Sequence, residues 1–182
     1  VFTPGLNEDL GATMVWGTQQ TNLFEGAKVD GVFSMWYGKG PGVDRCGDVF
    51  KHGNAAGTSP MGGVLALAAD DHACRSSTLP HGSELEFVSA MMPVLNPAGV
   101  QDILDMGLLG WAMSRFSGLW VALKCVTDVV ETSSVVDISA DRINCVTPAF
   151  DAPSDGLNIR TPDTPIAQEA RLFNFKLDAA MA

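Results

Sequence analysis

Three almost unbroken runs of apolar residues constrain the fold of this chain more than any other feature. They cover residues 29–37, 64–69 and 119–126, and Lys124 is the only charged residue in the last two runs. A strand that is covered on both faces needs apolar residues at successive positions, whereas a half-exposed strand alternates apolar with polar residues. The runs therefore predict buried strands of a mostly parallel sheet.

Helical patterns separate these runs. Asn7 is a favourable N-cap, and Glu8 and Asp9 follow it in a first turn where the helix dipole stabilises carboxylates. This helix is predicted to run towards Gln20. Further elements follow from proline, glycine and apolar spacing. They are a strand at residues 1–3, a helix over 84–91, a short strand at 94–95, and a long helix that begins at Asn96-Pro97 and ends at Ser117-Gly118.

The order of these elements predicts the fold class. Strands and helices alternate through residue 126, with a glycine-rich segment after residue 37. Such alternation is typical of α/β domains with right-handed crossovers between parallel strands. We therefore expect a three-layer α/β domain built on a mostly parallel, doubly wound sheet.

The character of the chain changes near residue 139. Prolines punctuate a polar segment at Pro148, Pro153, Pro162 and Pro165, and a last helix is predicted after Thr164-Pro165. We predict one domain over residues 1–137 and a connector over residues 138–182 that leads towards a following domain. Because the chain begins at Val1 without an initiator methionine, we expect that domain to be truncated at its N-terminus.

Charge and composition exclude several classes of protein. The chain carries 11 Lys and Arg against 21 Asp and Glu, for a net charge of -10, and it has no basic run that could bind nucleic acid. An acidic surface also disfavours anionic membranes, and no run of apolar residues is long enough to span a bilayer. Four scattered cysteines predict free thiols in a cytoplasmic protein. Only 18% of residues are charged, so we expect a partner to cover part of the surface.

Ligands of open parallel sheets bind beyond the carboxyl ends of the strands. That rule selects three polar segments that would meet at one edge of the predicted sheet. Their residues are Asn7 and Glu8, the glycine loop with Gly38, Lys39 and Gly40, and the segment with Asp70, Asp71, His72, Ser76 and Ser77.

Other kinds of site fit these segments poorly. Residues 38–42 lack the spacing of a phosphate-binding or dinucleotide-binding loop, because Phe33 and Val43 stand where glycines are required. The histidines and cysteine of residues 70–81 match no zinc-ligand spacing, so we predict no metal site. Residues 57–62 contain one residue too many for the nucleophile elbow of a serine hydrolase. We interpret residues 38–42 as a glycine turn that allows other groups to approach closely.

Several long stretches resemble one family. They are GLNEDLGATMVWGTQQ, GVFSMWYGKGPGVDRCGDVFKHGNAAGTSPMGGVLALAADDHACRSSTLPHGSE and MMPVLNPAGVQDILD. These stretches resemble the thiamine-diphosphate-dependent indolepyruvate ferredoxin oxidoreductases, in their long fused bacterial form. The resemblance covers residues 1–137, and the tail is similar to the connector of that family. It implies that residues 1–137 form the pyrimidine-binding domain of the thiamine-diphosphate-binding fold.

The resemblance also implies roles for the residues at the strand ends. Glu8 would be the catalytic carboxylate that faces N1′ of the aminopyrimidine. The implied cofactor-binding residues are Asn7, Glu8, Gly38, Lys39 and Gly40, and the implied substrate-loop residues are Asp71, His72, Ser76 and Ser77. Met61 and Gly82 stand where relatives carry histidine and glutamine, and these departures bear on specificity if either residue touches the substrate.

The implied reaction is the oxidative decarboxylation of a 2-oxo acid, most simply an arylpyruvate, to acyl-coenzyme A and CO2. A diphosphate-binding domain of the same enzyme would hold the diphosphate with its Mg2+, while iron–sulfur clusters and ferredoxin would bind elsewhere. We expect a homodimer, and we expect the fragment alone to be inactive. Two alternatives remain open. One is a non-catalytic association module of the same fold, and the other is a nucleotide-binding domain that uses the glycine loop.

Overall fold

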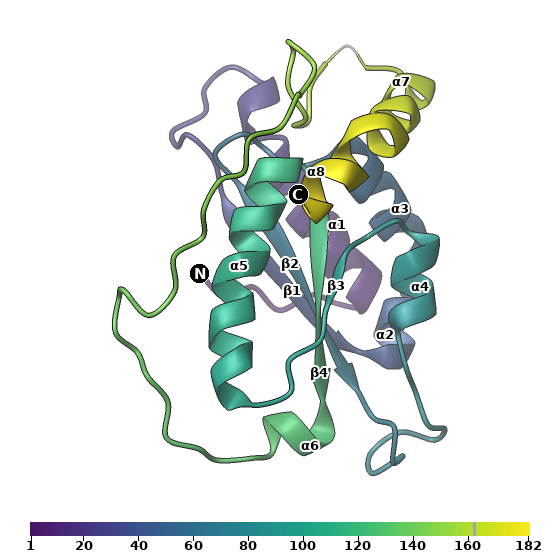
Figure 1. Cartoon of the computed structure of the whole chain (residues 1–182). Helices are drawn as coiled ribbons and strands as arrows, with labels where there is room; N and C mark the ends of the chain where they lie inside the picture. The colour runs from purple at the N-terminus through teal and green to yellow at the C-terminus, as the bar shows by residue number, and fades with distance from the viewer. Residues whose placement is uncertain (162) are drawn as a thin grey trace.

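The computed structural model describes residues 1–161 and 163–182. Its strands are β1 (Phe33–Lys39), β2 (Gly63–Asp70), β3 (Val94–Leu95) and β4 (Trp120–Val126), which form one sheet in the order β1-β2-β4-β3 (Figure 1). All three neighbouring pairs are parallel, and Ala66 of β2 lies between Trp36 of β1 and Ala122 of β4. The predicted parallel sheet is confirmed.

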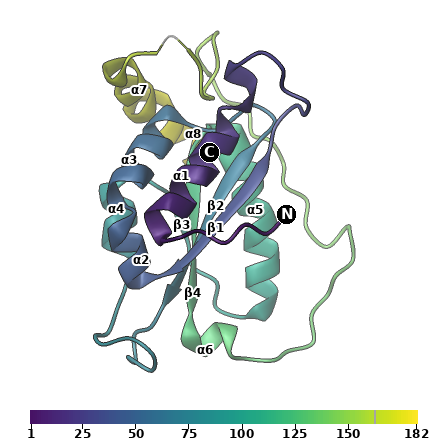
Figure 2. The ribbon, with the colours of Figure 1, turned by 180° about the vertical axis from the view of Figure 1, so that it is seen from behind.

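Helices cover both faces of this sheet (Figures 1 and 2). The helices on one face are α1 (Glu8–Gln19), α2 (Gly40–Arg45), α3 (Gly47–Ala56) and α4 (Glu84–Ser89), and α5 (Val100–Ser117) lies on the other. A right-handed crossover changes face when the chain reverses its direction across the sheet. The chain moves from β1 to β2 through α2 and α3, and it returns from β3 to β4 through α5. The sheet is therefore doubly wound, as predicted.

Aromatic rings fill the layer between α3 and the sheet. The ring of Phe50 in α3 lies 5.1 Å from that of Trp36 in β1, 5.7 Å from Phe87 in α4 and 6.1 Å from Trp120 in β4, measured between centroids. All four side chains are buried. Aromatic rings at these distances stabilise the folded state by more than the burial of their apolar surface alone. This cluster therefore joins four elements into the main core.

The long helix α5 approaches the opposite face through small residues. A Cβ atom added to Gly110 would lie only 2.6 Å from Cδ2 of Leu65 in β2. Ser114 Oγ accepts a hydrogen bond from the backbone N–H of Val64 at 2.9 Å. The helix ends at Ser117, and the C-cap Gly118 has a φ of 74°, the left-handed conformation that favours glycine. Larger side chains of this helix, such as Leu104 and Leu108, are partly exposed.

The first strand differs from its prediction. Residues 29–32 precede β1, which alternates between the buried Ser34 and Trp36 and the half-exposed Phe33, Met35 and Tyr37. The physical reason is position, since β1 is at the edge of the sheet and α5 packs mainly on β2 and β4. The prediction that this strand is covered on both faces is therefore wrong.

Other local predictions also need correction. Residues 1–3 form no strand, and the expected glycine turn at residues 38–42 is instead the end of β1 followed by α2. The helix α3 was not predicted, because its glycines suggested a loop. The start predicted at Asn96-Pro97 lies too early, since α5 begins at Val100 after the N-cap Gly99.

Part of the carboxyl-terminal segment packs back onto the domain. Residue Ile159 is buried, and its N–H donates to Thr58 O at 2.9 Å. The last elements are α6 (Thr127–Val130) after β4 and, farther on, α7 (Pro165–Arg171), a π-helical turn (Leu172–Lys176) and α8 (Leu177–Met181). Pro162 lies outside the described residues. The function of residues 138–182 as a connector stays a prediction.

The side chain of Lys176 connects this last helical segment to α3 through hydrogen bonds. Its Nζ donates to the carbonyl oxygens of Ala55 at 3.0 Å and Ala56 at 3.3 Å, which are at the carboxyl end of α3. Burial lowers the pKa of Lys176 to about 8. Across the described ranges, none of the helices is both long and apolar enough to cross a membrane.

Candidate functional site

The polar segments selected from the sequence lie at the carboxyl edge of the sheet, near α6 at the lower end of the view in Figure 1. β1, β2 and β4 end there at Lys39, Asp70 and Val126. The start of α2 and the loop of residues 71–83 follow two of these strands, and the first turn of α1 packs beside α2. This is the edge at which open α/β sheets bind their ligands.

Glu8 is held at the first turn of α1. The side chain of Asn7 caps the helix, since its Oδ1 accepts the N–H of Leu10 at 2.9 Å. The backbone oxygen of Glu8 accepts the indole N–H of Trp36 at 3.0 Å. Its side chain lies against α2, where a Cβ atom on Gly42 would be 2.6 Å from Glu8 Cγ. A glycine at position 42 is therefore required for this approach.

The carboxylate of Glu8 remains available for a ligand. Its side chain is 44% exposed, and its Oε2 lies 4.0 Å from Arg45 Nε. Arg45 is engaged mainly by the neighbouring Asp9, because the Nε to Oδ1 distance is only 2.8 Å. The hydrogen bond from Arg45 lowers the pKa of the Asp9 carboxyl group. The two first-turn acids thus differ, since Asp9 binds the guanidinium closely and Glu8 does not.

The glycines at the end of β1 allow aromatic rings to approach the backbone. A Cβ atom on Gly38 would lie 2.6 Å from the ring of Trp36, and one on Gly40 would overlap the ring of His81. His81 Nε2 lies 3.0 Å from Asp44 Oδ2 of α2. The predicted close approach to these glycines is therefore present, although it is made by protein side chains.

The loop of residues 71–83 is organised by Asp71. Its buried carboxylate accepts the N–H groups of Arg75 and Ser76, each at 2.8 Å. These two hydrogen bonds lower the pKa of Asp71 to about 2, and the bond from Ser76 contributes most. Lys39 Nζ then donates to Ser76 O at 2.8 Å and to Ser76 Oγ at 3.0 Å. The structure therefore brings together three predicted residues, Lys39, Asp71 and Ser76.

The remaining predicted loop residues occupy different surroundings. Ser77 Oγ is buried without a hydrogen-bond partner in the described structure. His72 is exposed on the loop, and its Cε1 would lie 3.3 Å from a Cβ atom on Gly82. Within the described part of the chain, no three His, Cys, Asp or Glu side chains converge as metal ligands.

An ionic cluster underneath this loop contains the buried Asp70 and Lys124, of which only Asp70 was among the polar residues selected from the sequence. Asp70 accepts the N–H of Ser83 at 2.9 Å and its hydroxyl at 2.6 Å, while Lys124 Nζ lies 3.8 Å from Asp70 Oδ2 and forms an ion pair with Glu84. The hydrogen bond from Lys124 lowers the pKa of Glu84. The signal in the sequence was Lys124, the only charge in an apolar strand. This cluster fastens the far end of the loop to β2 and β4.

The fold is an open α/β domain, and its polar segments lie at the edge of the sheet where such domains bind their ligands. Comparison adds a distant relative, since 153 residues of the chain are 27% identical to the indolepyruvate oxidoreductase subunit IorA of Methanothermobacter thermautotrophicus. The match covers 83% of this chain and 23% of the subunit, so the chain spans less than a quarter of its relative's length. No family model and no solved structure matches the chain. The chain is therefore similar, over most of its length, to part of an indolepyruvate oxidoreductase subunit.

Proposed function

We propose that this chain is the pyrimidine-binding domain of a thiamine-diphosphate-dependent 2-oxo-acid ferredoxin oxidoreductase that acts on indolepyruvate or another arylpyruvate. Two findings support this proposal: the similarity to subunit IorA over most of the chain, and the position of Glu8. The single observation that carries it is a carboxylate in the first turn of α1, packed on Gly42 at the carboxyl edge and still 44% exposed.

The residues at this edge fit an aminopyrimidine. Glu8 offers carboxylate oxygens that lie 4.0 Å from the nearest cation, so one of them is free to form a hydrogen bond with a ring nitrogen. Gly40 and Gly42 allow His81 and Glu8 to pack directly on α2, which holds the Glu8 side chain at this edge. When bound, thiamine diphosphate supplies the electron sink that decarboxylation of a 2-oxo acid requires.

The residues of this chain would bind and orient rather than perform that chemistry. Glu8 would hold a proton at the ring nitrogen, and Asn7 would fix the helix turn that carries it. Lys39 and Asp71 hold Ser76 in place, which positions the loop with His72 and Ser77 beside the same edge. Gly38 allows the Trp36 ring to lie against the strand end.

The other parts of the proposed enzyme lie outside this chain. A diphosphate-binding domain would hold Mg2+ and the diphosphate, and iron–sulfur clusters elsewhere would pass electrons to ferredoxin. Coenzyme A would accept the acyl group. A homodimer is part of the same proposal, because isologous pairs are the commonest assemblies.

The first test compares Glu8→Gln with Asp9→Asn in the complete enzyme. The glutamine variant keeps the shape of the side chain but loses the carboxylate, so we expect turnover to fall by about 100-fold or more. The asparagine variant is a matched control because it removes the neighbouring first-turn charge, and we expect a change of only a few-fold. Circular dichroism should show both variants folded. Near-normal turnover by Glu8→Gln would contradict the proposal.

A further inference from the structure

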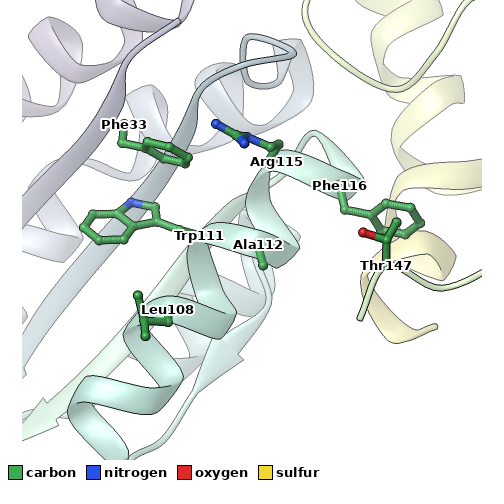
Figure 3. Close-up of a pocket in the computed structure, with 7 residues that line it drawn as sticks. All are labelled: Phe33, Leu108, Trp111, Ala112, Arg115, Phe116 and Thr147. Carbon is green, nitrogen blue, oxygen red and sulfur yellow. The ribbon is translucent and has the colours of Figure 1, made fainter. Parts of the chain in front are cut away.

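A second candidate site lies at the opposite end of the sheet from Glu8. It is a groove of about 540 Å3 on the outer side of α5, near the start of β1 (Figure 3). Three aromatic rings line it, those of Phe33, Trp111 and Phe116, together with the side chain of Arg115. Its volume is within the range that small-molecule sites occupy. The groove therefore has the size and the apolar walls of a ligand site.

Arg115 differs from every other arginine in the described structure. The chain has six arginines, and five of them form ion pairs with carboxylates at 4.0 Å or less, namely Arg45, Arg75, Arg142, Arg160 and Arg171. Arg115 forms none among the described residues, although the chain has 21 acidic side chains. Its partners are instead the ring of Phe33, 4.5 Å from Cζ to the centroid, and the carbonyl oxygen of Met61 at 3.3 Å. The guanidinium thus carries an unmatched positive charge.

Two donors beside the groove lack acceptors. Arg115 Nε and Trp111 Nε1 are both buried without a hydrogen-bond partner in the described structure. Trp111 packs against Phe33, with 5.7 Å between the ring centroids and 54° between the planes. None of the residues that line the groove is acidic. Buried donors are normally satisfied, so this corner of the molecule is short of acceptors and of negative charge.

The position of Arg115 in the last turn of α5 accounts for part of its charge, because cations stabilise the carboxyl ends of helices. That effect requires neither the aromatic walls nor the stacking on Phe33. Arginine offers a planar fork of donors to a carboxylate and can stack on a ring at the same time. A ligand that combines one carboxylate with an aromatic body would match both features.

We propose that this groove binds an aromatic monocarboxylate, with the carboxylate on Arg115 and the ring against Phe33 and Trp111 (Figure 3). A single charge is expected, because the groove offers one cation and the chain has a net charge of -10 that repels polyanions. The proposal does not depend on the proposed function, since it concerns other residues at the other end of the sheet.

The test is a titration of the 15N-labelled 182-residue chain with 3-phenylpropionate, monitored by NMR. The chain has four tryptophans, and Trp111→Phe identifies the indole N–H signal of the groove. We expect that signal to shift saturably at millimolar or lower concentrations. Propionate lacks the ring and 3-phenylpropanol lacks the charge, so each should bind at least about tenfold more weakly.

Two variants assign the interaction. Arg115→Met keeps the apolar stem of the side chain and should weaken binding about tenfold or more, whereas Arg142→Met removes another arginine that contacts α5 and should leave it unchanged. If Arg115→Met does not fold, Arg115→Lys is titrated instead with the same three ligands, 3-phenylpropionate, propionate and 3-phenylpropanol. The proposal is overturned if no signal saturates, if 3-phenylpropanol binds equally well, or if Arg142→Met weakens binding as much as Arg115→Met. Signal broadening that grows with protein concentration would also overturn it, since a second copy would then fill the groove.

Discussion

The two faces of the sheet are covered in different ways. On the α3 face, Phe50 lies among three large rings from three other elements, and all are buried. On the α5 face, the helix contacts the sheet through Gly110 and Ser114, while its leucines and the outer residues of β1 stay partly exposed. The large side chains of the α3 face are therefore fully buried, whereas on the α5 face only the residues next to the sheet are buried.

This difference predicts that the α3 face contributes mainly to the stability of the fold and the outer α5 face mainly to binding. Well-packed interiors respond strongly to any change in volume, whereas a half-exposed apolar side chain contributes less to the folded state. Apolar side chains that stay exposed together are typical of surfaces that contact ligands or other proteins. We expect substitutions on the α3 face to change the free energy of unfolding most, and substitutions on the outer α5 face to change binding.

The largest expected effect distinguishes two phenylalanines. Phe50→Ala would leave a cavity among Trp36, Phe87 and Trp120, so we expect the free energy of unfolding to fall by about 3–5 kcal/mol. Phe33→Ala removes a ring that is already 48% exposed, and a loss of about 1 kcal/mol is expected. Urea unfolding of the 182-residue chain measures both. Equal losses would mean that the α5 face is packed as completely as the α3 face.

A smaller effect tests how closely α5 lies to the sheet. Gly110→Ala would place its Cβ atom 2.6 Å from the fully buried Leu65, so we expect a destabilisation of about 1–2 kcal/mol. Gly107→Ala is the matched control in the same helix, because no atom of the described residues outside this helix turn lies within 4 Å of its added Cβ. Alanine is the better helix former, so this control should gain up to about 1 kcal/mol. A neutral Gly110→Ala would refute the close approach.

The smallest expected effect concerns the acid stability of the loop at residues 71–83. The pKa of Asp71 falls from 3.8 to about 2 because the folded loop donates N–H groups to its carboxylate. A lowered pKa contributes stability that is present above pH 3.8 and is lost as the pH falls towards 2. Thermal unfolding measured across this range should therefore show a shallower pH dependence for Asp71→Asn than for the unchanged chain. Identical slopes would show that Asp71 does not organise the loop.

The sequence alone predicted the elements in which local and tertiary preferences agree. Apart from Asp70 and Lys124, β2 and β4 contain only glycine and apolar residues, and both lie in the middle of the sheet, so their burial could be anticipated. The start of α1 followed from Asn7, whose side chain does cap the helix. In these elements, the pattern of residues and the final environment impose the same structure.

The errors occurred where neighbours outside the segment decide the conformation. β1 resembles a buried strand in composition, but it lies at the edge of the sheet. The residues of the strand themselves do not indicate this position in the sheet. The glycines of α2 and α3 suggested a loop, yet several are needed because Glu8, His81 and Trp120 pack directly on the helix backbone at Gly42, Gly40 and Gly53. Tertiary contacts therefore overcame a weak helix propensity.

The candidate site shows the same division. The polar segments at the carboxyl edge were selected by their residue types and because ligands of open parallel sheets bind beyond the carboxyl ends of the strands. The family resemblance selected Glu8, whose catalytic role stays a prediction. Sequence alone determined the class of fold and the chemistry available at that edge, because periodicity and residue type are local properties. Only the tertiary structure decided that Lys39 meets Ser76, that Asp70 and Lys124 support the loop, and that Arg115 forms no ion pair with a carboxylate of the described residues. These pairings join residues from different elements, so they depend on how the layers pack.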